Sequence, residues 1–220
     1  GAEGMIEGID ERIDFRVDVV FTVDPENVRT AVRRLVDRGA QAFVVALVNS
    51  VVNPAHEKQV ERIILEEYPS HLLGAIPIVL SHRVAGRKGE YARTMSAILD
   101  AYLHDQMYHG LASLERVLRR HGYRRPMLVV HNSGGMAQMS STHSLQTVHS
   151  GPVAGLEATQ SLSVQFNEPN LIATDMGGTS FDIGLVTGDG VKFYDFNPVI
   201  DRWLVSAQMS YLHTLGAGGG

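Results

Sequence analysis

Short apolar runs alternate with amphipathic stretches through the first 80 residues. The runs at 17–22, 43–48 and 76–80 are short and rich in β-branched residues, which predicts strands. Between the first two runs, apolar residues recur at the spacing of one helix face: Val28, Ala31, Val32, Leu35 and Val36. The order strand, helix, strand, helix, strand predicts parallel strands with helices packed on the sheet.

Capping residues bound the two helices of this region. Asp24 and Pro25 are a typical N-cap and first-turn proline, and Gly39 is a typical terminator. The second helix begins after Asn53-Pro54 and stops before Pro69. Local chemistry therefore predicts where both helices begin and end.

A long helix is predicted from about residue 90 to residue 120. We expect its apolar stripe to be core, and it comprises Tyr91, Met95, Ile98, Leu99, Tyr102, Leu111, Leu114 and Leu118. A strand at 127–131, a polar loop at 132–147 and a helix beginning at Ser150-Gly151-Pro152 and reaching about residue 161 follow.

The periodicity then changes to short strands. An apolar strand at 171–174 ends at Asp175, and strand-like alternation resumes at Ile183. Gly188-Asp189-Gly190 is a strong hairpin signal before a further strand at 191–193. We place a domain boundary near residue 148, giving domains 1–147 and 148–220, with the long helix and the strand after it bridging the two lobes.

The segment with the clearest chemistry is Asp175-Met176-Gly177-Gly178-Thr179-Ser180-Phe181-Asp182. Two adjacent glycines let the backbone present its amides to an anion, and Thr179 and Ser180 add hydroxyl donors. Asp175 and Asp182 are hard oxygen ligands of the kind that Mg²⁺ prefers. Strands rather than a helix follow the glycines, and the lysine of a Walker loop is missing, so the segment does not match a Walker loop. It resembles the phosphate-binding hairpin of the actin, hexokinase and Hsp70-like ATPases.

Composition excludes several other functions. The chain has no cysteine, which rules out thiolate chemistry and fits a reducing compartment, so we expect a cytoplasmic protein. Net charge is −5, and the arginines near residue 120 sit at a helix end, so we expect no nucleic-acid partner. The most apolar stretch, 41–52, is too short to span a membrane. The spacing of His104 and His109 makes a poor chelate.

The sequence resembles the hydantoinase A and 5-oxoprolinase family, within the actin-like ATPase superfamily. Seven segments in family order carry the resemblance: Glu11 to Phe15, Asn53 to Glu57, Glu90 to Thr94 with Ala101 to Leu103, Asn132 to Gly135, Ser150 to Gly155, Asp175 to Asp182, and Leu215 to Gly220. Phe181 and the segment Arg202-Trp203-Leu204-Val205 favour the branch that contains the acetone and acetophenone carboxylases.

This resemblance implies an α/β fold of two ribonuclease H-like lobes with mixed sheets flanked by helices, and an enzyme that uses ATP and Mg²⁺ to activate a small amide or ketone. A hydantoinase B-like subunit or domain is the implied partner. By the same resemblance Asp175 and Asp182 are catalytic, with Asp175 on the metal. The implied nucleotide-binding residues are Gly177, Gly178, Thr179, Ser180, Gly216, Gly218 and Gly219. The last three belong to a glycine-rich element that contacts the adenosine.

One departure from the family pattern concerns length. Family members carry a second phosphate hairpin near their N-terminus, which is not found in this sequence, and their second lobe continues further. We therefore expect a fragment with an incomplete second lobe that is inactive alone. Two other hypotheses remain open: a regulatory protein of the same superfamily that binds a ligand without turnover, and an assembly scaffold. Amide hydrolysis and carboxylation also remain open.

Overall fold

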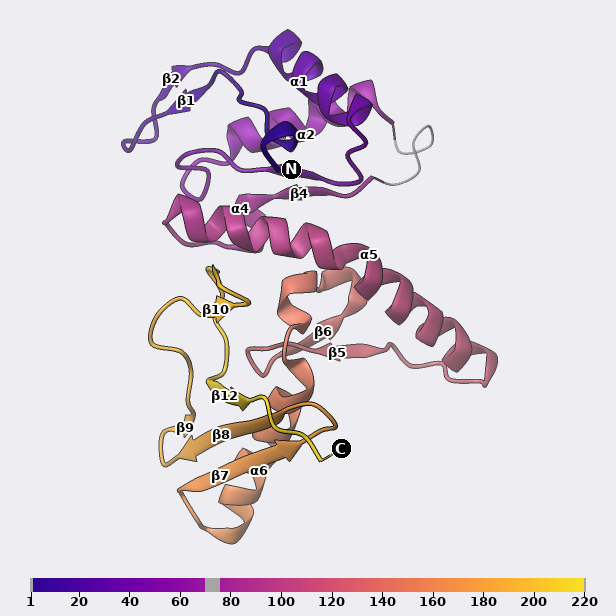
Figure 1. Cartoon of the computed structure of the whole chain (residues 1–220), viewed down its shortest axis with the longest axis vertical. Helices are drawn as coiled ribbons and strands as arrows, with labels where there is room; N and C mark the ends of the chain where they lie inside the picture. Colours follow the sequence, from indigo (N-terminus) through magenta and orange to yellow (C-terminus); the bar gives the residue numbers. More distant parts are fainter. Residues whose placement is uncertain (1, 70–75, 220) are drawn as a thin grey trace. The chain divides into compact units, whose positions relative to one another are not determined.

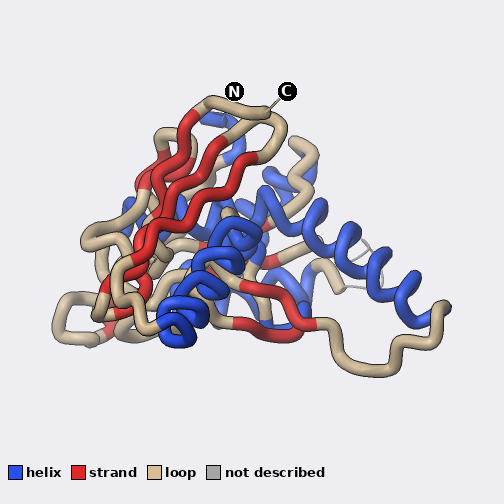
Figure 2. The backbone as a smooth tube through the Cα atoms, turned by 90° about the horizontal axis from the view of Figure 1, so that it is seen from below, coloured by secondary structure: helices blue, strands red, loops and turns tan. Residues whose placement is uncertain are grey.

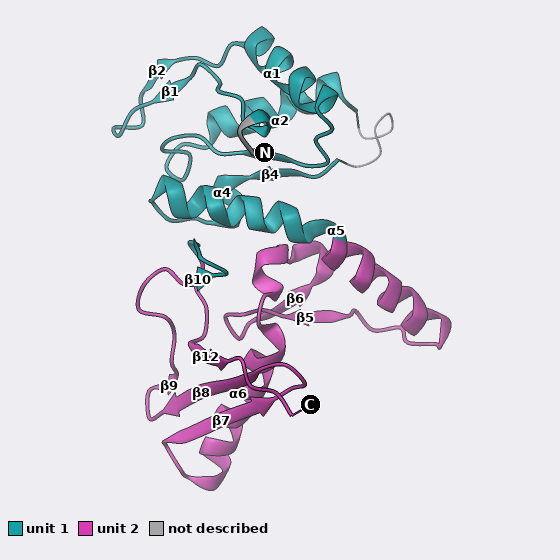
Figure 3. Cartoon of the chain, viewed as in Figure 1, with its two compact units in different colours: residues 1–105, 199–206 teal, residues 106–198, 207–220 magenta. Residues whose placement is uncertain are grey.

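The computed structural model describes residues 2–69 and 76–219 and divides the chain into two compact units. The first comprises residues 1–105 and 199–206, and the second comprises residues 106–198 and 207–220 (Figure 3). The helix α5 (Glu90–Arg120), predicted with these bounds, contributes residues to both units. The predicted boundary near residue 148 falls inside the second unit and stays a prediction about the two lobes.

Two helices and two parallel strands build the core of the first unit (Figure 1). β3 (Phe43–Val45) pairs in parallel with β4 (Ile78–Leu80), and α1 (Pro25–Asp37) and α2 (Ala55–Glu67) contribute to the same apolar cluster. The cluster contains Val23, Val28, Val32, Phe43, Val45, Val60, Ile63, Ile64 and Leu80. The helical spacing seen in the sequence therefore marks the buried faces.

The predicted helix boundaries are confirmed by their caps. The side chain of Asp24 accepts a hydrogen bond from the amide of Glu26 at 3.0 Å, and Gly39 follows α1 with a φ of 87°. The amide of Ala55 donates to the side chain of Asn53 at 3.1 Å, and α2 ends at Glu67, before Pro69.

The first predicted strand does not join the parallel pair. It becomes β2 (Val19–Phe21), which pairs antiparallel with β1 (Arg12–Ile13) and is exposed along its length. The carboxylate of Asp14 accepts hydrogen bonds from the backbone amides of Arg16 and Asp18. These bonds close the turn between β1 and β2. The prediction of three parallel strands was wrong, because this local turn gives the apolar run an antiparallel neighbour.

The buried face of α5 is also not the one predicted. Tyr91, Ile98 and Tyr102 of the predicted stripe are 59%, 42% and 73% exposed, whereas the buried residues of the helix are Ala92, Arg93, Ser96, Ala97 and Asp100. Ser96 accepts the amide of Ser206 at 2.8 Å. Small and hydrogen-bonded side chains permit this close packing, so hydrophobicity alone selected the wrong face.

Arg93 and Glu57 form the polar centre of the first unit. Glu57 is fully buried and accepts hydrogen bonds from the amide of Leu47 (3.0 Å), the hydroxyl of Ser81 (2.6 Å) and the amide and Nδ1 of His82 (3.2 and 2.6 Å). Arg93, also fully buried, donates to the hydroxyl of Ser81 and to the carbonyl of Leu47. These bonds connect α2, α5, the turn after β3 and the short helix α4 (Ser81–Val84).

Two further short strands complete the first unit. They are β10 (Val199–Ile200) and β11 (Trp203–Leu204), which form an antiparallel pair. At the opposite end of the chain, a 3-10 turn spans Ala2–Met5.

The second unit contains a sheet with the spatial order β12-β8-β7, visible as neighbouring strands in Figure 2. β7 (Leu171–Met176), β8 (Phe181–Thr187) and β12 (Leu212–Leu215) are antiparallel, and β9 (Gly190–Val191) extends β8 as a hairpin. The predicted hairpin at residues 188–190 is thus confirmed.

The helix α6 (Ser150–Phe166) packs on one face of this sheet. It begins at the predicted Ser150 and runs five residues beyond the predicted end. Val153 and Leu156 meet Val186 and Leu212 in a small apolar core. Gly184 is needed there, because a Cβ at this position would lie 2.7 Å from a methyl group of Leu156.

The region expected to be a loop, 132–147, contains regular structure. β5 (Leu128–Val130) pairs antiparallel with β6 (Met136–Gln138), and 3-10 turns follow at Met139–Ser141 and Ser144–Thr147. The glycine pair at Gly134 makes the tight turn, with a φ of 82° at Gly134 itself. β6 is only three residues long and pairs on one side only, so the sequence carries little signal for this strand.

Candidate nucleotide-phosphate site

The hairpin between β7 and β8 is the candidate site. Asp175 lies directly opposite Asp182 in the strand register, and Met176 lies opposite Phe181. The four residues from Gly177 to Ser180 form the loop between them, closed by a hydrogen bond of 2.9 Å from the amide of Gly177 to the carbonyl of Ser180. A strand, not a helix, leaves this loop, as the sequence predicted.

The loop presents free donors to solvent. Gly177, Gly178 and Thr179 are exposed, and Ser180 is half-buried. Within residues 2–69 and 76–219, the amides of Gly178 and Thr179 donate to no protein acceptor. Adjacent unpaired amides in a glycine loop form a concave anion-binding surface. The loop is therefore chemically suited to a phosphate group.

The two carboxylates face the same side of the sheet. Residues directly opposite in adjacent strands share a face, and like charges in that position repel each other. Asp175 is exposed and Asp182 is half-buried. A bound cation would relieve the repulsion, and two carboxylates make an oxygen donor set that fits Mg²⁺.

Thr214 is a member of the site that the sequence analysis missed. It lies opposite Asp182 in β12, and its hydroxyl donates a hydrogen bond of 2.5 Å to Oδ1 of Asp182. The strand alternation held the signal, because Leu212 faces the core and places Thr214 on the same face two residues later.

The glycine-rich segment after β12 packs against the phosphate hairpin. The amide of Gly219 donates to the carbonyl of Gly177 at 3.0 Å. A Cβ on Gly218 would lie 2.6 Å from the amide nitrogen of Thr179 and would overlap the carbonyl of Gly178. Gly216 has open space around it, and Gly220 lies outside the described residues. The structure thus brings Gly218 and Gly219 to the loop that carries the unpaired amides.

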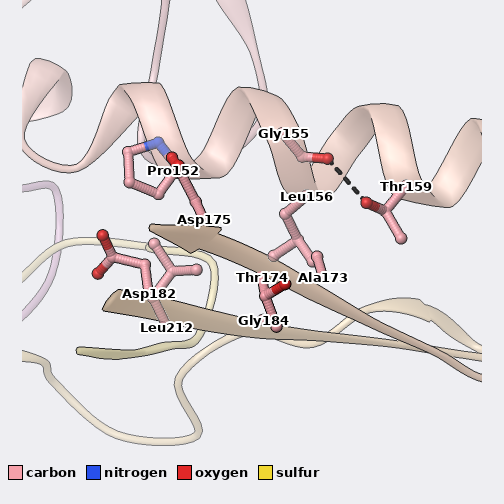
Figure 4. Close-up of a pocket in the computed structure, with 10 residues that line it drawn as sticks. All are labelled: Pro152, Gly155, Leu156, Thr159, Ala173, Thr174, Asp175, Asp182, Gly184 and Leu212. Carbon is pink, nitrogen blue, oxygen red and sulfur yellow. Dashed lines mark hydrogen bonds between the residues drawn. The ribbon is translucent and has the colours of Figure 1, made fainter. Parts of the chain in front are cut away.

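A cavity of ≈ 170 Å³ opens beside the two carboxylates (Figure 4). One wall belongs to α6 and the other to the sheet, and the residues that line it are Pro152, Gly155, Leu156, Thr159, Ala173, Thr174, Asp175, Asp182, Gly184 and Leu212. Pro152 of the predicted Ser150-Gly151-Pro152 segment is among them. Gly134 and Gly135 are not, and Gly134 instead lies against the side chain of Glu157.

Three further features considered in the sequence are an ion pair of the long helix, a histidine metal site and a membrane span. Arg93 and Glu90 form the ion pair expected of them, with Nη1 and Oε1 3.7 Å apart. In the part of the chain that the structure describes, no group of three or more histidine, aspartate or glutamate side chains is arranged to hold a metal ion. No helix among the described residues is long and apolar enough to cross a membrane.

Comparison with solved structures defines the class of fold. The nucleotide-free acetone carboxylase structure matches with a TM-score of 0.86 at 27% identity over 97% of this chain and 30% of that chain. The ATP-dependent caprolactamase from Pseudomonas jessenii matches with a TM-score of 0.82 at 26% identity over 96% and 30%. The chain therefore has the α/β architecture of the actin-like ATPase type, with ribonuclease H-like lobes.

Sequence comparison identifies the family. The model of the hydantoinase/oxoprolinase N-terminal region matches residues 4–68, and the hydantoinase/oxoprolinase model matches residues 93–220. This chain belongs to the hydantoinase/oxoprolinase family, as the resemblance in the sequence indicated.

Individual relatives include subunits of carboxylases. The acetophenone carboxylase gamma subunit of Aromatoleum aromaticum is 46% identical over 98% of this chain, and the acetone carboxylase beta subunit of Xanthobacter autotrophicus is 27% identical over 98%. The chain spans about 30% of the length of each. Caprolactamase subunit alpha of Pseudomonas jessenii is 28% identical over 90% of this chain and 28% of its own length.

Proposed function

We propose that this chain is the nucleotide-binding portion of an ATP-dependent enzyme that activates the carbonyl group of a small ketone or amide. The hairpin from Asp175 to Asp182 is the phosphate site, with the unpaired amides of Gly178 and Thr179 and the hydroxyls of Thr179 and Ser180 as donors. The amide of Gly177 instead closes the loop by donating to the carbonyl of Ser180. The observation that carries the proposal is the pair of opposed carboxylates beside unpaired, exposed glycine-loop amides. Anion donors and cation ligands adjoin each other there, as a nucleotide–metal complex requires.

Asp175 and Asp182 would hold Mg²⁺, and Thr214 would fix the orientation of Asp182 through its hydrogen bond. Bound Mg²⁺ supplies neutralisation of the charge on the phosphate chain, which is the main requirement of phosphoryl transfer together with positioning. Gly218 and Gly219 would hold the loop in shape from behind, which the contact of Gly218 with the Gly178–Thr179 peptide supports. In this proposal they support the phosphate loop rather than contact the adenosine.

Within the family, we propose the ketone carboxylase branch. The 46% identity to the acetophenone carboxylase gamma subunit stands against 28% to caprolactamase subunit alpha, over nearly the same part of the chain. The names of these relatives are those of subunits, which supports a partner subunit, and we propose that this partner is of the hydantoinase B type. We also propose that the isolated chain has little or no ATPase turnover; a rate equal to that of an intact family enzyme would contradict this.

Calorimetric titration with ADP and Mg²⁺ tests the site. We expect saturable binding that requires Mg²⁺, and at least a tenfold loss of affinity in Asp175→Asn, because the substitution removes a charged metal ligand while keeping its shape. Asp189→Asn is the matched control, because Asp189 lies in the neighbouring β8–β9 hairpin and does not line the cavity. The affinity of this variant for ADP with Mg²⁺ should equal that of the wild type. Equal affinities for all three proteins would refute the assignment.

A further inference from the structure

The cavity beside Asp175 and Asp182 has a distribution of charge that excludes one class of ligand. None of its ten lining residues is lysine, arginine or histidine, and the two carboxylates form its charged end. An anion inside the cavity would meet negative charge without a compensating cation. A neutral molecule meets no such penalty, and it can place a polar group toward the carboxylate end.

Apart from Thr159 and Thr174, the remaining walls are apolar. Leu156 and Leu212 belong to the core of the second unit, and Ala173 packs against that core. The volume of ≈ 170 Å³ is below the roughly 300–1,000 Å³ of pockets for drug-sized ligands, so the cavity suits a small molecule of about one ring. The apolar part of the wall favours burial of the hydrocarbon part of such a molecule.

The α6 wall contains one position where the chain leaves room. Pro152, Gly155, Leu156 and Thr159 follow one another at the spacing of a single helix face, and all four line the cavity (Figure 4). A Cβ on Gly155 would meet no atom within 4 Å. Glycine weakens a helix interior relative to alanine, and the packing gives no reason for it here. The empty space in front of Gly155 is therefore part of the cavity.

From these observations we propose that the cavity binds the neutral carbonyl substrate of the enzyme and that Gly155 sets the largest substrate it admits. This inference rests on the proposed function, because a carbonyl group at the carboxylate end then adjoins the nucleotide and its cation. The apolar body of the substrate packs between α6 and the sheet, against Leu156 and Leu212. Gly155 is a specificity-determining residue, and larger residues at this position exclude ring-containing ketones.

Acetophenone is the probe for a direct test. In ¹H–¹⁵N spectra of the chain without nucleotide, we expect saturable shifts of the amides of Gly155, Ala173 and Gly184. Benzoate has nearly the same shape but carries a negative charge, and we expect it to bind at least tenfold more weakly. Shifts confined to other parts of the chain, or equal affinity for the two probes, would overturn the inference.

The variant Gly155→Val tests the role of the open position. Valine suits a helix better than glycine does, and its Cβ meets no atom within 4 Å, so the melting temperature should not fall, whereas acetophenone affinity should fall at least tenfold. Gly155→Ala should give an intermediate loss. Gly110→Ala is the matched control, because Gly110 also lies inside a long helix with no atom within 4 Å of an added Cβ, and it does not line the cavity. Unchanged affinity in Gly155→Val overturns the inference.

Nucleotide binding is measured in the same variants to keep the two proposals separate. We expect Gly155→Val to bind ADP and Mg²⁺ as wild type does, and Asp175→Asn to bind them at least tenfold more weakly. Acetophenone binding that is lost in Gly155→Val, in a chain that fails to bind ADP with Mg²⁺, supports the cavity as a ligand site but contradicts the proposed function. ADP binding without acetophenone binding contradicts only the cavity assignment.

Discussion

The buried carboxylate of the first unit, Glu57, and the opposed carboxylates of the second unit, Asp175 and Asp182, have different surroundings. Glu57 is fully buried and accepts four hydrogen bonds, which use its oxygens within the protein. Asp182 accepts a hydrogen bond from Thr214 and lies opposite Asp175 at the rim of a cavity. A carboxylate whose oxygen atoms all accept hydrogen bonds within the protein stabilises the fold. Carboxylates that accept few hydrogen bonds and have a like-charged neighbour are suited to binding a cation.

Both kinds of carboxylate lie in segments that carry the family resemblance. Glu57 ends the Asn53 to Glu57 segment, and Asp175 begins the hairpin segment. Similarity to a family therefore identifies both without separating their roles. The number of hydrogen bonds that each carboxylate accepts distinguishes the two roles, and the following four experiments test that distinction.

The largest effect is expected from Glu57→Ala. Loss of this carboxylate leaves Ser81, His82 and the amide of Leu47 without their acceptor and leaves Arg93 without a nearby buried counter-charge. Breaking a buried charged network in this way costs about 3–5 kcal/mol. Urea unfolding measures the loss. Glu66→Ala, on an exposed side of the same helix, should change stability by less than about 1 kcal/mol. Equal losses of unfolding free energy in the two variants would show that the hydrogen bonds of Glu57 do not stabilise the fold.

A smaller effect is expected from Gly218→Ala, which tests the second region. The new methyl group would overlap the Gly178 carbonyl, so the glycine-rich segment must shift, at a cost of about 1–3 kcal/mol in stability. Affinity for ADP with Mg²⁺ should fall with it, because the shift displaces the loop amides. Gly216→Ala has open space and should match wild type in both measurements. Normal nucleotide affinity in Gly218→Ala would contradict the supporting role.

The stability of the protein should depend on pH through the buried carboxylate of Glu57. Burial alone would raise the pKa of Glu57, but the hydrogen bonds from Ser81, His82 and Leu47 outweigh it, and the pKa lies below its ordinary value of 4.5. A lowered folded-state pKa means that the unfolded chain binds the proton more tightly, so this stabilisation is present above pH 4.5 and is lost as the pH falls toward the folded-state pKa.

Urea unfolding between pH 7 and pH 3 measures this loss. Wild type should lose stability through the acid range more steeply than Glu57→Gln, which cannot titrate at this position. Parallel pH profiles for the two proteins would show that the buried carboxylate gains nothing from its donors.

The smallest effect on stability is expected from Thr214→Val. This change removes one exposed hydrogen bond to Asp182 and keeps the side-chain shape, so unfolding should change by less than about 1 kcal/mol. The concentration of Mg²⁺ needed for half-maximal ADP binding should rise several-fold, because the carboxylate loses its fixed orientation. Thr214→Ser should restore it. An unchanged Mg²⁺ requirement in Thr214→Val would place Thr214 outside the site.

Sequence alone predicted elements whose signals are local. The caps at Asp24 and Gly39, the bounds of α5 and the two hairpins of the second unit depend on residues close together in the chain, and the structure confirms them. The candidate phosphate loop was predictable for the same reason, since its aspartates and glycines lie within eight consecutive residues.

Tertiary structure decided which faces and distant segments meet. The sequence did not indicate that α5 buries Arg93 instead of Tyr91, because burial depends on partners such as Ser81 that lie elsewhere in the chain. Nor did it indicate that Thr214 holds Asp182 or that Gly155 faces the cavity. Local propensity acts over a few residues, whereas packing and hydrogen bonding act between residues far apart in sequence, and only the folded chain determines those pairs.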